Sequence, residues 1–173
     1  MSIDQVKAAI RDVADFPKPG IVFKDITPVL QDASVFRMAN DLFYERYRNQ
    51  GIDKVAGIDA RGFIFGSVLA DRLGCGFIPI RKKGKLPFDA HEVSYDLEYG
   101  SATLELHVDA TGHGDRVVVI DDLLATGGTA AATVELLNKL ECNVIEVAFL
   151  VELAFLGGRE KLGDVAAWAP VVY

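Results

Sequence analysis

The segment at residues 117–129 constrains the fold more than any other part of the sequence. It begins with a run of β-branched residues, which is typical of a parallel strand covered on both faces. We expect this strand to end in Asp121 and Asp122, a glycine-rich loop to follow, and a helix to occupy residues 130–140. In open parallel sheets, ligands bind beyond the carboxyl ends of the strands. The segment therefore predicts a binding site together with a strand–loop–helix unit.

Strands and helices alternate along most of the chain. Apolar residues at helical spacing predict a helix at residues 62–73, which Gly74 ends. Alternating apolar and polar residues at 102–108 predict a half-buried strand, and with it a β-hairpin inserted between residues 88 and 108. Further strands are expected at residues 54–59, 76–80 and 144–151. This order predicts an α/β fold in which helices flank a central, mainly parallel sheet.

The N-terminal part of the sequence is less regular. Apolar residues at helical spacing between residues 3 and 13 predict a short amphipathic helix, and the prolines and glycine of residues 16–20 end it. We expect the apolar run at residues 21–23 to lie in irregular surroundings, and Pro28 to end that segment. A longer helix is expected to follow at residues 32–47.

Charge and composition narrow the class of protein. The 173 residues predict one domain, and their net charge of −7 argues against non-specific binding to nucleic acid or to anionic membranes. No apolar stretch approaches the roughly 18 residues of a membrane span, and no signal region is present, so we expect a cytoplasmic protein. The 2 cysteines are too few for a disulfide scaffold, and the 3 histidines lie in no metal-binding spacing. An anionic ligand would need a local positive site, and residues 81–85 provide one.

The loop at residues 125–129 has the composition of a phosphate-binding loop. Gly127 and Gly128 let backbone amides approach a ligand closely, and the next helix adds free amides and the positive end of its dipole. The segment has neither the lysine of a Walker loop nor the glycine spacing of a dinucleotide-binding loop. Asp121 and Asp122 would repel a phosphate unless they hold something else, and vicinal ribose hydroxyls, alone or with Mg²⁺, meet that need. We therefore expect a phosphorylated ribose as ligand.

Residues 121–129, with the sequence DDLLATGGT, resemble the phosphoribosyl-pyrophosphate loop of type I phosphoribosyltransferases, and above all of the members that act on adenine. Other segments resemble, in order, the family's base-binding segment, its pyrophosphate loop, its mobile loop and a segment under the base. These are residues 16–26, 58–63, 81–87 with 95–100, and 151–153. The resemblance implies a type I phosphoribosyltransferase-like fold, as one domain over residues 1–173. In it, residues 1–33 form a base-binding hood, and residues 81–108 form a mobile loop and β insertion.

The resemblance also implies a reaction of purine salvage. Such an enzyme transfers the 5-phosphoribosyl group from phosphoribosyl pyrophosphate (PRPP) to adenine, and it releases AMP and pyrophosphate. Mg²⁺ would accompany PRPP and be held mainly by that substrate, with no metal site of the protein's own. The implied assembly is a homodimer with the segment around Arg61 near the interface, and neither nucleic acid nor a membrane is an expected partner.

Individual roles follow from the same resemblance. Asp121 and Asp122 would hold the ribose hydroxyls, and Glu98 would be the catalytic acid or base near adenine N7. The 5′-phosphate would be bound by Ala125, Thr126, Gly127, Gly128 and Thr129. The pyrophosphate would be bound by Asp59, Ala60, Arg61, Lys85 and Tyr99, with a cis peptide between Asp59 and Ala60. Adenine would be bound by Val22, Phe23, Lys24 and Leu153, stacked between Phe23 and Leu153. Many relatives have arginine in place of Lys24, and a lysine lacks the planar guanidinium fork.

Two alternatives stay open at this stage. The first is a sister transferase that acts on xanthine, hypoxanthine, guanine or a pyrimidine. The second is a non-catalytic regulator that keeps the fold as a ligand sensor for DNA or RNA control. The acidic charge of the chain and the lack of a recognisable DNA-binding segment count against the regulator.

Overall fold

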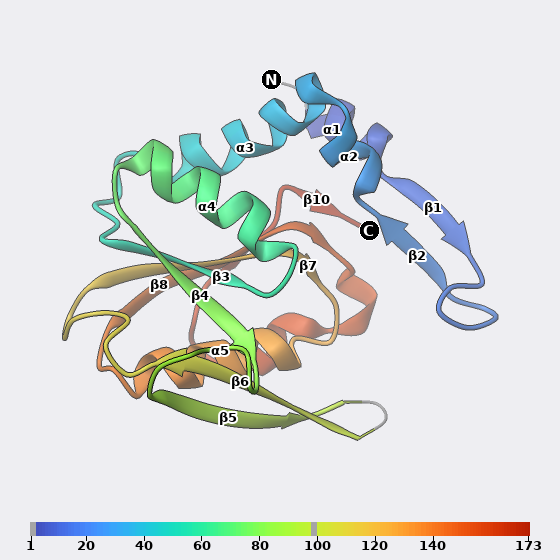
Figure 1. Cartoon of the computed structure of the whole chain (residues 1–173). Helices are drawn as coiled ribbons and strands as arrows, with labels where there is room; N and C mark the ends of the chain where they lie inside the picture. Colours follow the sequence, from blue (N-terminus) through green and yellow to red (C-terminus); the bar gives the residue numbers. More distant parts are fainter. Residues whose placement is uncertain (1–2, 98–99) are drawn as a thin grey trace.

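The computed structural model describes residues 3–97 and 100–173, which form a central sheet with helices on both faces (Figure 1). Parallel strands occupy most of this sheet, in the spatial order β10-β8-β7-β3-β4. Their bounds are β3 (Lys54–Ile58), β4 (Gly76–Lys82), β7 (Arg116–Leu124), β8 (Asn143–Glu152) and β10 (Val171–Val172). The predicted α/β fold with a mainly parallel sheet is confirmed.

The remaining strands extend this sheet at its edges. The predicted hairpin consists of β5 (Ala90–Asp96) and β6 (Ser101–His107), and β6 pairs antiparallel with the end of β4. Short β9 (Ala167–Trp168) pairs with β8. Helices α3 (Ala33–Tyr47) and α4 (Gly62–Leu73) cover one face of the sheet, and α5 (Gly128–Asn138) covers the other (Figure 1). The hairpin packs beside α5, so it lies near the start of that helix and the loop that precedes it.

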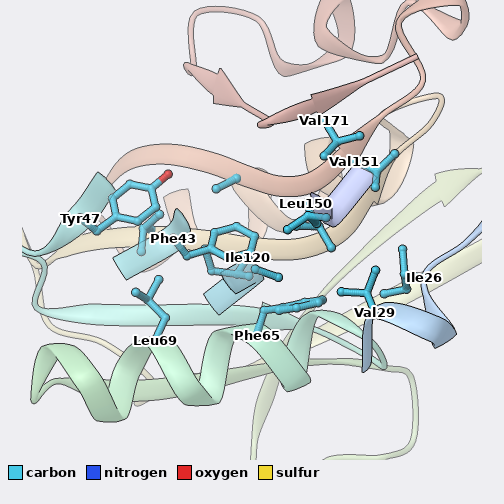
Figure 2. Packing of buried hydrophobic residues seen from close by; sticks show 14 of the residues in the cluster. Ile26, Val29, Phe43, Tyr47, Phe65, Leu69, Ile120, Leu150, Val151 and Val171 are labelled. Atoms are coloured by element: carbon cyan, nitrogen blue, oxygen red, sulfur yellow. The ribbon is translucent and has the colours of Figure 1, made fainter. Parts of the chain in front are cut away.

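Both faces of β7 are buried, as its run of β-branched residues predicts. Val118 and Ile120 belong to the hydrophobic cluster beneath α3 and α4, in which Phe65 also packs (Figure 2). Val117 and Val119 belong to the second cluster, on the side of α5. All four strand residues are fully buried. Because both of its faces are packed, β7 has a fixed position, and this also fixes the backbone that carries Asp121 and Asp122 at its carboxyl end.

The N-terminal segment differs from the sequence prediction in two respects. Helix α1 (Ile3–Ala9) ends before Val13, which instead lies in β1 (Arg11–Ala14) opposite Phe23 of β2 (Val22–Asp25). The expected helix was therefore too long, and the run at residues 21–23 enters a strand rather than an irregular segment. Pairing between the two strands, which local helical spacing does not report, decides both outcomes.

Two other elements also begin or end elsewhere than predicted. Pro28 does not end a segment but lies in the first turn of α2 (Thr27–Gln31), where the N–H that proline lacks would have no helical partner anyway. Strand β7 does not end at the two acids but runs on to Leu124, because Leu123 and Leu124 still pair with Val151 and Glu152 of β8. The helix expected at residues 130–140 is α5, which begins at Gly128.

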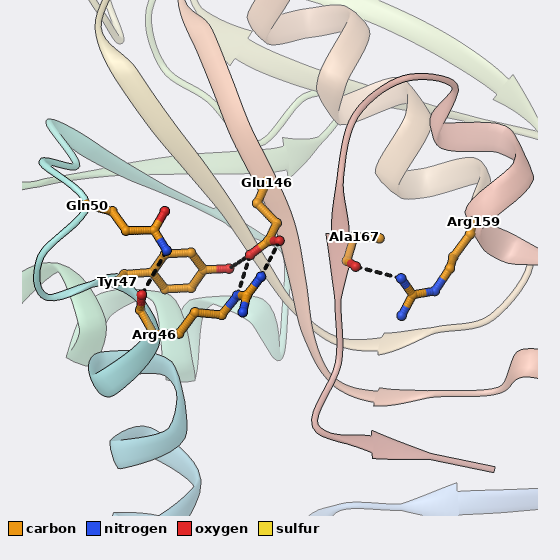
Figure 3. Close-up of polar contacts among 6 residues, drawn as sticks. All are labelled: Arg46, Tyr47, Gln50, Glu146, Arg159 and Ala167. Atoms are coloured by element: carbon orange, nitrogen blue, oxygen red, sulfur yellow. Dashed lines mark hydrogen bonds and ion pairs between the residues drawn. The ribbon is translucent and has the colours of Figure 1, made fainter.

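Charged side chains anchor the elements that surround β8 (Figure 3). Glu146, which is buried, accepts two hydrogen bonds from Arg46 of α3 at 2.6 Å each and one from the Tyr47 hydroxyl at 2.5 Å. Burial, mainly, raises the pKa of Tyr47. Arg159 lies in the short helix η2 (Gly158–Leu162), which follows η1 (Ala154–Leu156), and donates to the carbonyl of Ala167 at 2.6 Å. Within the described ranges, no helix is long and apolar enough to cross a membrane.

Candidate active site

A cavity of about 390 Å³ opens where the carboxyl ends of β3 and β7 meet the hairpin. It joins the turn after β3, the acids of β7, the inner side of the hairpin and the first turn of α5. Its lining residues are Ile58, Asp59, Ala60, Arg61, Lys82, Tyr95, Leu97, Ala102, Leu104, Asp121, Asp122 and Thr129. The structure thus brings together six residues that the sequence assigned to ribose, phosphate or pyrophosphate, from two separate segments of the chain.

The phosphate-binding loop lines a second, smaller cavity beside the first. All five residues predicted for the 5′-phosphate line it, and Asp121 and Thr129 are common to both cavities. Gly127 has a φ of +81°, and a Cβ at this position would lie 2.2 Å from the carbonyl oxygen of Gly158. Only glycine satisfies both conditions, because a side chain would be strained and would also collide with the backbone. Gly158 therefore supports the loop from behind.

The two acids have different surroundings. Asp122 is buried and its carboxylate accepts a hydrogen bond from Nε of Arg61. Asp121 is half-buried, and its Oδ1 accepts a hydrogen bond at 2.9 Å from the backbone N–H of Asp122. Burial in the protein, together with the neighbouring Asp122 charge, raises the pKa of Asp121 well above its ordinary value. A guanidinium therefore holds the Asp122 side chain in place, whereas a backbone amide holds that of Asp121.

The turn that carries Arg61 lies directly against the acids. The Asp59–Ala60 peptide is cis, as the family resemblance implied. Arg61 directly precedes α4, and a Cβ on the next residue, Gly62, would lie 2.5 Å from the carbonyl oxygen of Ile120. Glycine at this position lets the turn approach β7 closely enough for Arg61 to reach Asp122.

The basic segment at residues 81–85 is partly strand and partly loop. Arg81 and Lys82 end β4, and Gly84 has the positive φ of a turn. Nε of Arg81 lies 3.3 Å from the carboxylate of Asp59. This contact connects the basic segment to residues 59–61, the turn predicted to bind pyrophosphate (the pyrophosphate turn). Lys85, the lysine predicted to bind pyrophosphate, is exposed and does not line the cavity. Its role stays a prediction.

Three of the four residues predicted to bind adenine lie in β2 of the hood, and the fourth, Leu153, follows β8. The ring of Phe23 packs edge-to-face on Phe16 at 5.3 Å between centroids, and the two rings border a shallow apolar hollow. Leu153 directly follows β8 and is nearly buried. Val22 is exposed, but Lys24 is not turned toward this hollow: its ammonium lies 2.6 Å from Asp12. The structure does not bring the Lys24 side chain to Phe23.

Comparison with known proteins identifies the family. Residues 27–169 match a family model described as phosphoribosyl transferase domain. The adenine phosphoribosyltransferase of Albidiferax ferrireducens is 59% identical over 165 residues, which are 94% of this chain and 85% of the relative. That of Nitrosococcus oceani is 52% identical over 171 residues, 99% of this chain and 100% of the relative. The chain belongs to the adenine phosphoribosyltransferase family.

Solved structures of the same family agree with the fold. The adenine phosphoribosyltransferase of Thermoanaerobacter pseudethanolicus has a TM-score of 0.95 and 46% identity, and the match covers 99% of this chain and 100% of that one. The enzyme of Saccharomyces cerevisiae, solved with adenine and an imino-altritol bisphosphate, has a TM-score of 0.93 and 39% identity, and the match covers 98% of each chain. The predicted type I phosphoribosyltransferase-like fold is confirmed by these likenesses.

Two of the predicted site residues are not among those that the structure describes, and some residues that line the cavity were not predicted. Glu98 and Tyr99 lie outside the described residues. Sequence reasoning gave no role to Lys82, Tyr95 or Leu97, which all line the central cavity. The hydroxyl of Thr129 donates a hydrogen bond to the Tyr95 hydroxyl oxygen at 3.0 Å. The sequence signal that was available is the alternation of polar and apolar residues in β5, which puts Tyr95 on the same strand face as buried Val93.

The residues of this adenine phosphoribosyltransferase site fit a magnesium ion that comes with a substrate. No group of three or more histidine, cysteine or acidic side chains in the described part of the chain could hold a metal by itself. Mg²⁺ is commonly bound through one or two carboxylates together with substrate phosphates. Asp121 and Asp122 provide that pair of carboxyl groups at the cavity wall.

Proposed function

We propose that this enzyme makes AMP and pyrophosphate from adenine and PRPP in purine salvage, and that the cavity between Arg61, Asp121 and Thr129 is where it does so. One observation carries the assignment: the pyrophosphate turn, the two acids and the phosphate loop line two adjoining cavities that share Asp121 and Thr129. PRPP needs those three kinds of group, because it has a phosphate at one end, a pyrophosphate at the other and a ribose diol between them.

The acids and the loop would fix the sugar. Asp121 and Asp122 accept hydrogen bonds from the ribose hydroxyls, and residues 125–129 bind the 5′-phosphate at the start of α5. The approach of Gly127 to Gly158 supports the shape of this loop before the substrate arrives. A sugar held at both ends presents C1 in a constant position, and this is worth several orders of magnitude in rate.

Arg61 would hold the leaving group. Its Nε is used on Asp122, but half of the Arg61 side chain remains exposed, so other N–H groups of the guanidinium can reach a pyrophosphate oxygen. Transfer breaks the bond between C1 and pyrophosphate, forms the bond between C1 and adenine N9, and releases the N9 proton. Positive charge develops on the ribose and negative charge on the pyrophosphate, and Arg61 with Lys85 stabilises the latter.

Mg²⁺ bound with PRPP would neutralise part of the pyrophosphate charge beside Asp121 and Asp122. The proton of adenine is assigned to Glu98, and pyrophosphate binding to Tyr99 as well, on the family resemblance. Tyr95 and Leu97 of the hairpin line the same cavity, so the hairpin is placed to keep water from the reacting sugar. Exclusion of water favours transfer to adenine over hydrolysis of PRPP.

The decisive test of the site is the double variant Asp121→Asn with Asp122→Asn. Each amide keeps the size of the carboxyl group but loses its charge and half of its acceptor capacity. We expect kcat/KM to fall by at least about 100-fold, since several charge-assisted hydrogen bonds are lost. The exposed Asp109→Asn change is the matched control and should leave activity unchanged. Near-normal turnover in the double variant would remove the assigned role of the two acids.

For the assembly, we propose a cytoplasmic homodimer with the segment around Arg61 near the interface. The support is the family resemblance in sequence. Light scattering on the purified chain should give about twice its mass of 18.8 kDa. A monomer at the concentrations of the activity assay would contradict this.

A further inference from the structure

Tyr173 holds the backbone on both sides of Leu153. The Tyr173 N–H donates to the carbonyl of Glu152 at 2.9 Å, and the Tyr173 carbonyl accepts from the N–H of Ala154 at 3.0 Å. Leu153 lies between these two bonds, and its own N–H donates to the carbonyl of Leu124 at 2.9 Å. The position of Leu153 is therefore fixed from the end of β10 as well as from β7.

The ring of Tyr173 forms cation–π contacts with two lysines of the hood. The ammonium of Lys24, in β2, lies 3.9 Å from the ring centroid, and that of Lys7, in α1, lies 4.5 Å from it. Lys7 also donates to the carbonyl of Val172 at 2.8 Å, and Lys24 forms an ion pair with Asp12 of β1 at 2.6 Å. Figure 1 shows the end of the chain after β10 beside β2. Helix α1 and strand β2 thus contact the Tyr173 side chain directly, and β1 is connected to it through the ion pair of Asp12 with Lys24.

Successive residues of a strand point to opposite sides. In β2, Phe23 therefore faces the apolar hollow with Phe16, while Lys24 faces Asp12 and Tyr173. The Lys24 side chain is only 14% exposed, so its ammonium is largely withdrawn from water and its contact with the ring is correspondingly stronger. The contacts of Lys24 with Asp12 and Tyr173 therefore also fix β2, the strand that carries Phe23.

We infer that Tyr173 is a positioning residue of the adenine site, which sets the separation between Phe23 and Leu153 without touching the base. This inference rests on the proposed function, because those two residues are the assigned stacking partners of adenine. Lys24 belongs to the same device and acts through Tyr173 and Asp12, not by contact with adenine. A compact ammonium serves this purpose well, because it needs a ring face and a carboxylate rather than a planar fork.

The test compares Tyr173→Leu with Tyr173→Phe in steady-state kinetics. Leucine removes the aromatic face, and we expect the KM for adenine to rise about fivefold, the size of a single partly desolvated cation–π contact, while the KM for PRPP stays unchanged. Phenylalanine keeps the face and should restore the wild-type KM. A change that merely loosened the fold would raise both KM values or lower kcat alone.

The matched control is Tyr44→Leu. Tyr44 carries Arg72 at 4.1 Å from its ring centroid, and Arg72 pairs with Asp41 at 2.7 Å, so the same kind of contact is lost on the far side of α3. We expect an unchanged KM for adenine. A Tyr173→Leu enzyme with the wild-type KM for adenine, or with the KM for PRPP raised to the same extent, would overturn the inference.

Lys24→Met in a background that carries both Tyr173→Leu and Asp12→Asn separates positioning from contact. If Lys24 acts through Tyr173 and Asp12, adding Lys24→Met should leave the KM for adenine at the value of that background. A further multiplicative increase would mean that Lys24 touches the base and would overturn its part of the inference. Asp12→Asn weakens the hold on Lys24 from an exposed residue and keeps the test available if Tyr173→Leu folds poorly; it should raise the KM for adenine in the same direction. Absence of AMP formation by the wild-type chain would instead refute the proposed function.

Discussion

Arg61 donates a hydrogen bond from its Nε to the carboxylate of Asp122, and so joins the pyrophosphate turn to the ribose acids across the sheet. Asp122 is buried whereas half of the Arg61 side chain is exposed. The contact holds the Asp122 side chain in place, and the remaining guanidinium donors stay available to the cavity that Arg61 lines.

The first prediction concerns pH. Burial and the nearby Asp122 raise the pKa of Asp121, so the folded chain holds its proton more tightly than the unfolded chain. The free energy of unfolding therefore falls as the pH rises from the ordinary aspartate pKa of 3.8 through the raised value. Asparagine has no proton to lose, so Asp121→Asn should be more stable than wild type at neutral pH and should have a higher Tm. The difference should vanish toward pH 4.

Thermal unfolding from about pH 4 to pH 8 measures this. Asp109→Asn, at an exposed position, should follow the wild-type curve throughout. A Tm difference between wild type and Asp121→Asn that does not vary with pH would contradict the predicted titration.

The second prediction concerns the phosphate loop. Gly127→Ala should raise the KM for PRPP and cost about 2 kcal/mol of stability or more, because the methyl group meets the carbonyl of Gly158 in addition to the strained φ. Gly114 has nearly the same φ, +79°, but nothing within 4 Å of an added Cβ. Gly114→Ala should therefore cost only about 1 kcal/mol and leave the KM for PRPP unchanged. Equal effects of the two changes would show that the close approach does not matter.

The third prediction concerns the basic segment. Lys82 lines the central cavity, whereas the neighbouring Lys83 is paired with Glu92 at 2.6 Å on the outside of the hairpin. Lys82→Met should raise the KM for PRPP about tenfold, the value of one charge-assisted hydrogen bond. Lys83→Met should change it less than about twofold, since exposed ion pairs contribute little. A larger effect at Lys83 than at Lys82 would refute this assignment.

The sequence predicted the parts of the site that depend on local chemistry. Residues 117–129 contain, in order, a buried strand, two acids, a glycine-rich loop and the start of a helix. Because these parts follow one another in the chain, the segment predicted both the fold class and the ligand. The end of β7 was misplaced, because an acid at the edge of a cavity can still pair with the next strand. Local composition does not report that pairing.

The parts that the sequence could not predict depend on contacts between distant segments. Lys24 lies next to Phe23 in sequence, yet its surroundings are set by Asp12 and Tyr173. Lys82 is one of four basic residues in a short run, and only the pairing of β4 with β6 decides which of them faces the cavity. Periodicity and motif spacing carry no information about such pairings.

The fourth prediction addresses Glu98, whose assignment rests on the resemblance. Glu98→Gln should lower kcat by about 100-fold, the usual contribution of a general acid or base, with Tm unchanged. Glu92→Gln, in β5 and not lining the cavity, is the control and should leave kcat unchanged. A loss of Tm that parallels the loss of activity would point to a structural glutamate instead.

The most direct test of the account is AMP formation by the purified wild-type chain with PRPP and Mg²⁺, with adenine compared with xanthine, hypoxanthine, guanine and pyrimidine bases. We predict rapid formation of AMP and pyrophosphate with adenine and no nucleotide from the other bases. Product from another base in place of adenine would retain the sugar-phosphate site and contradict the assignment of Phe23 and Leu153 to adenine. No product with any base, from folded chain that still binds PRPP, would contradict the central claim and favour a ligand-sensing regulator.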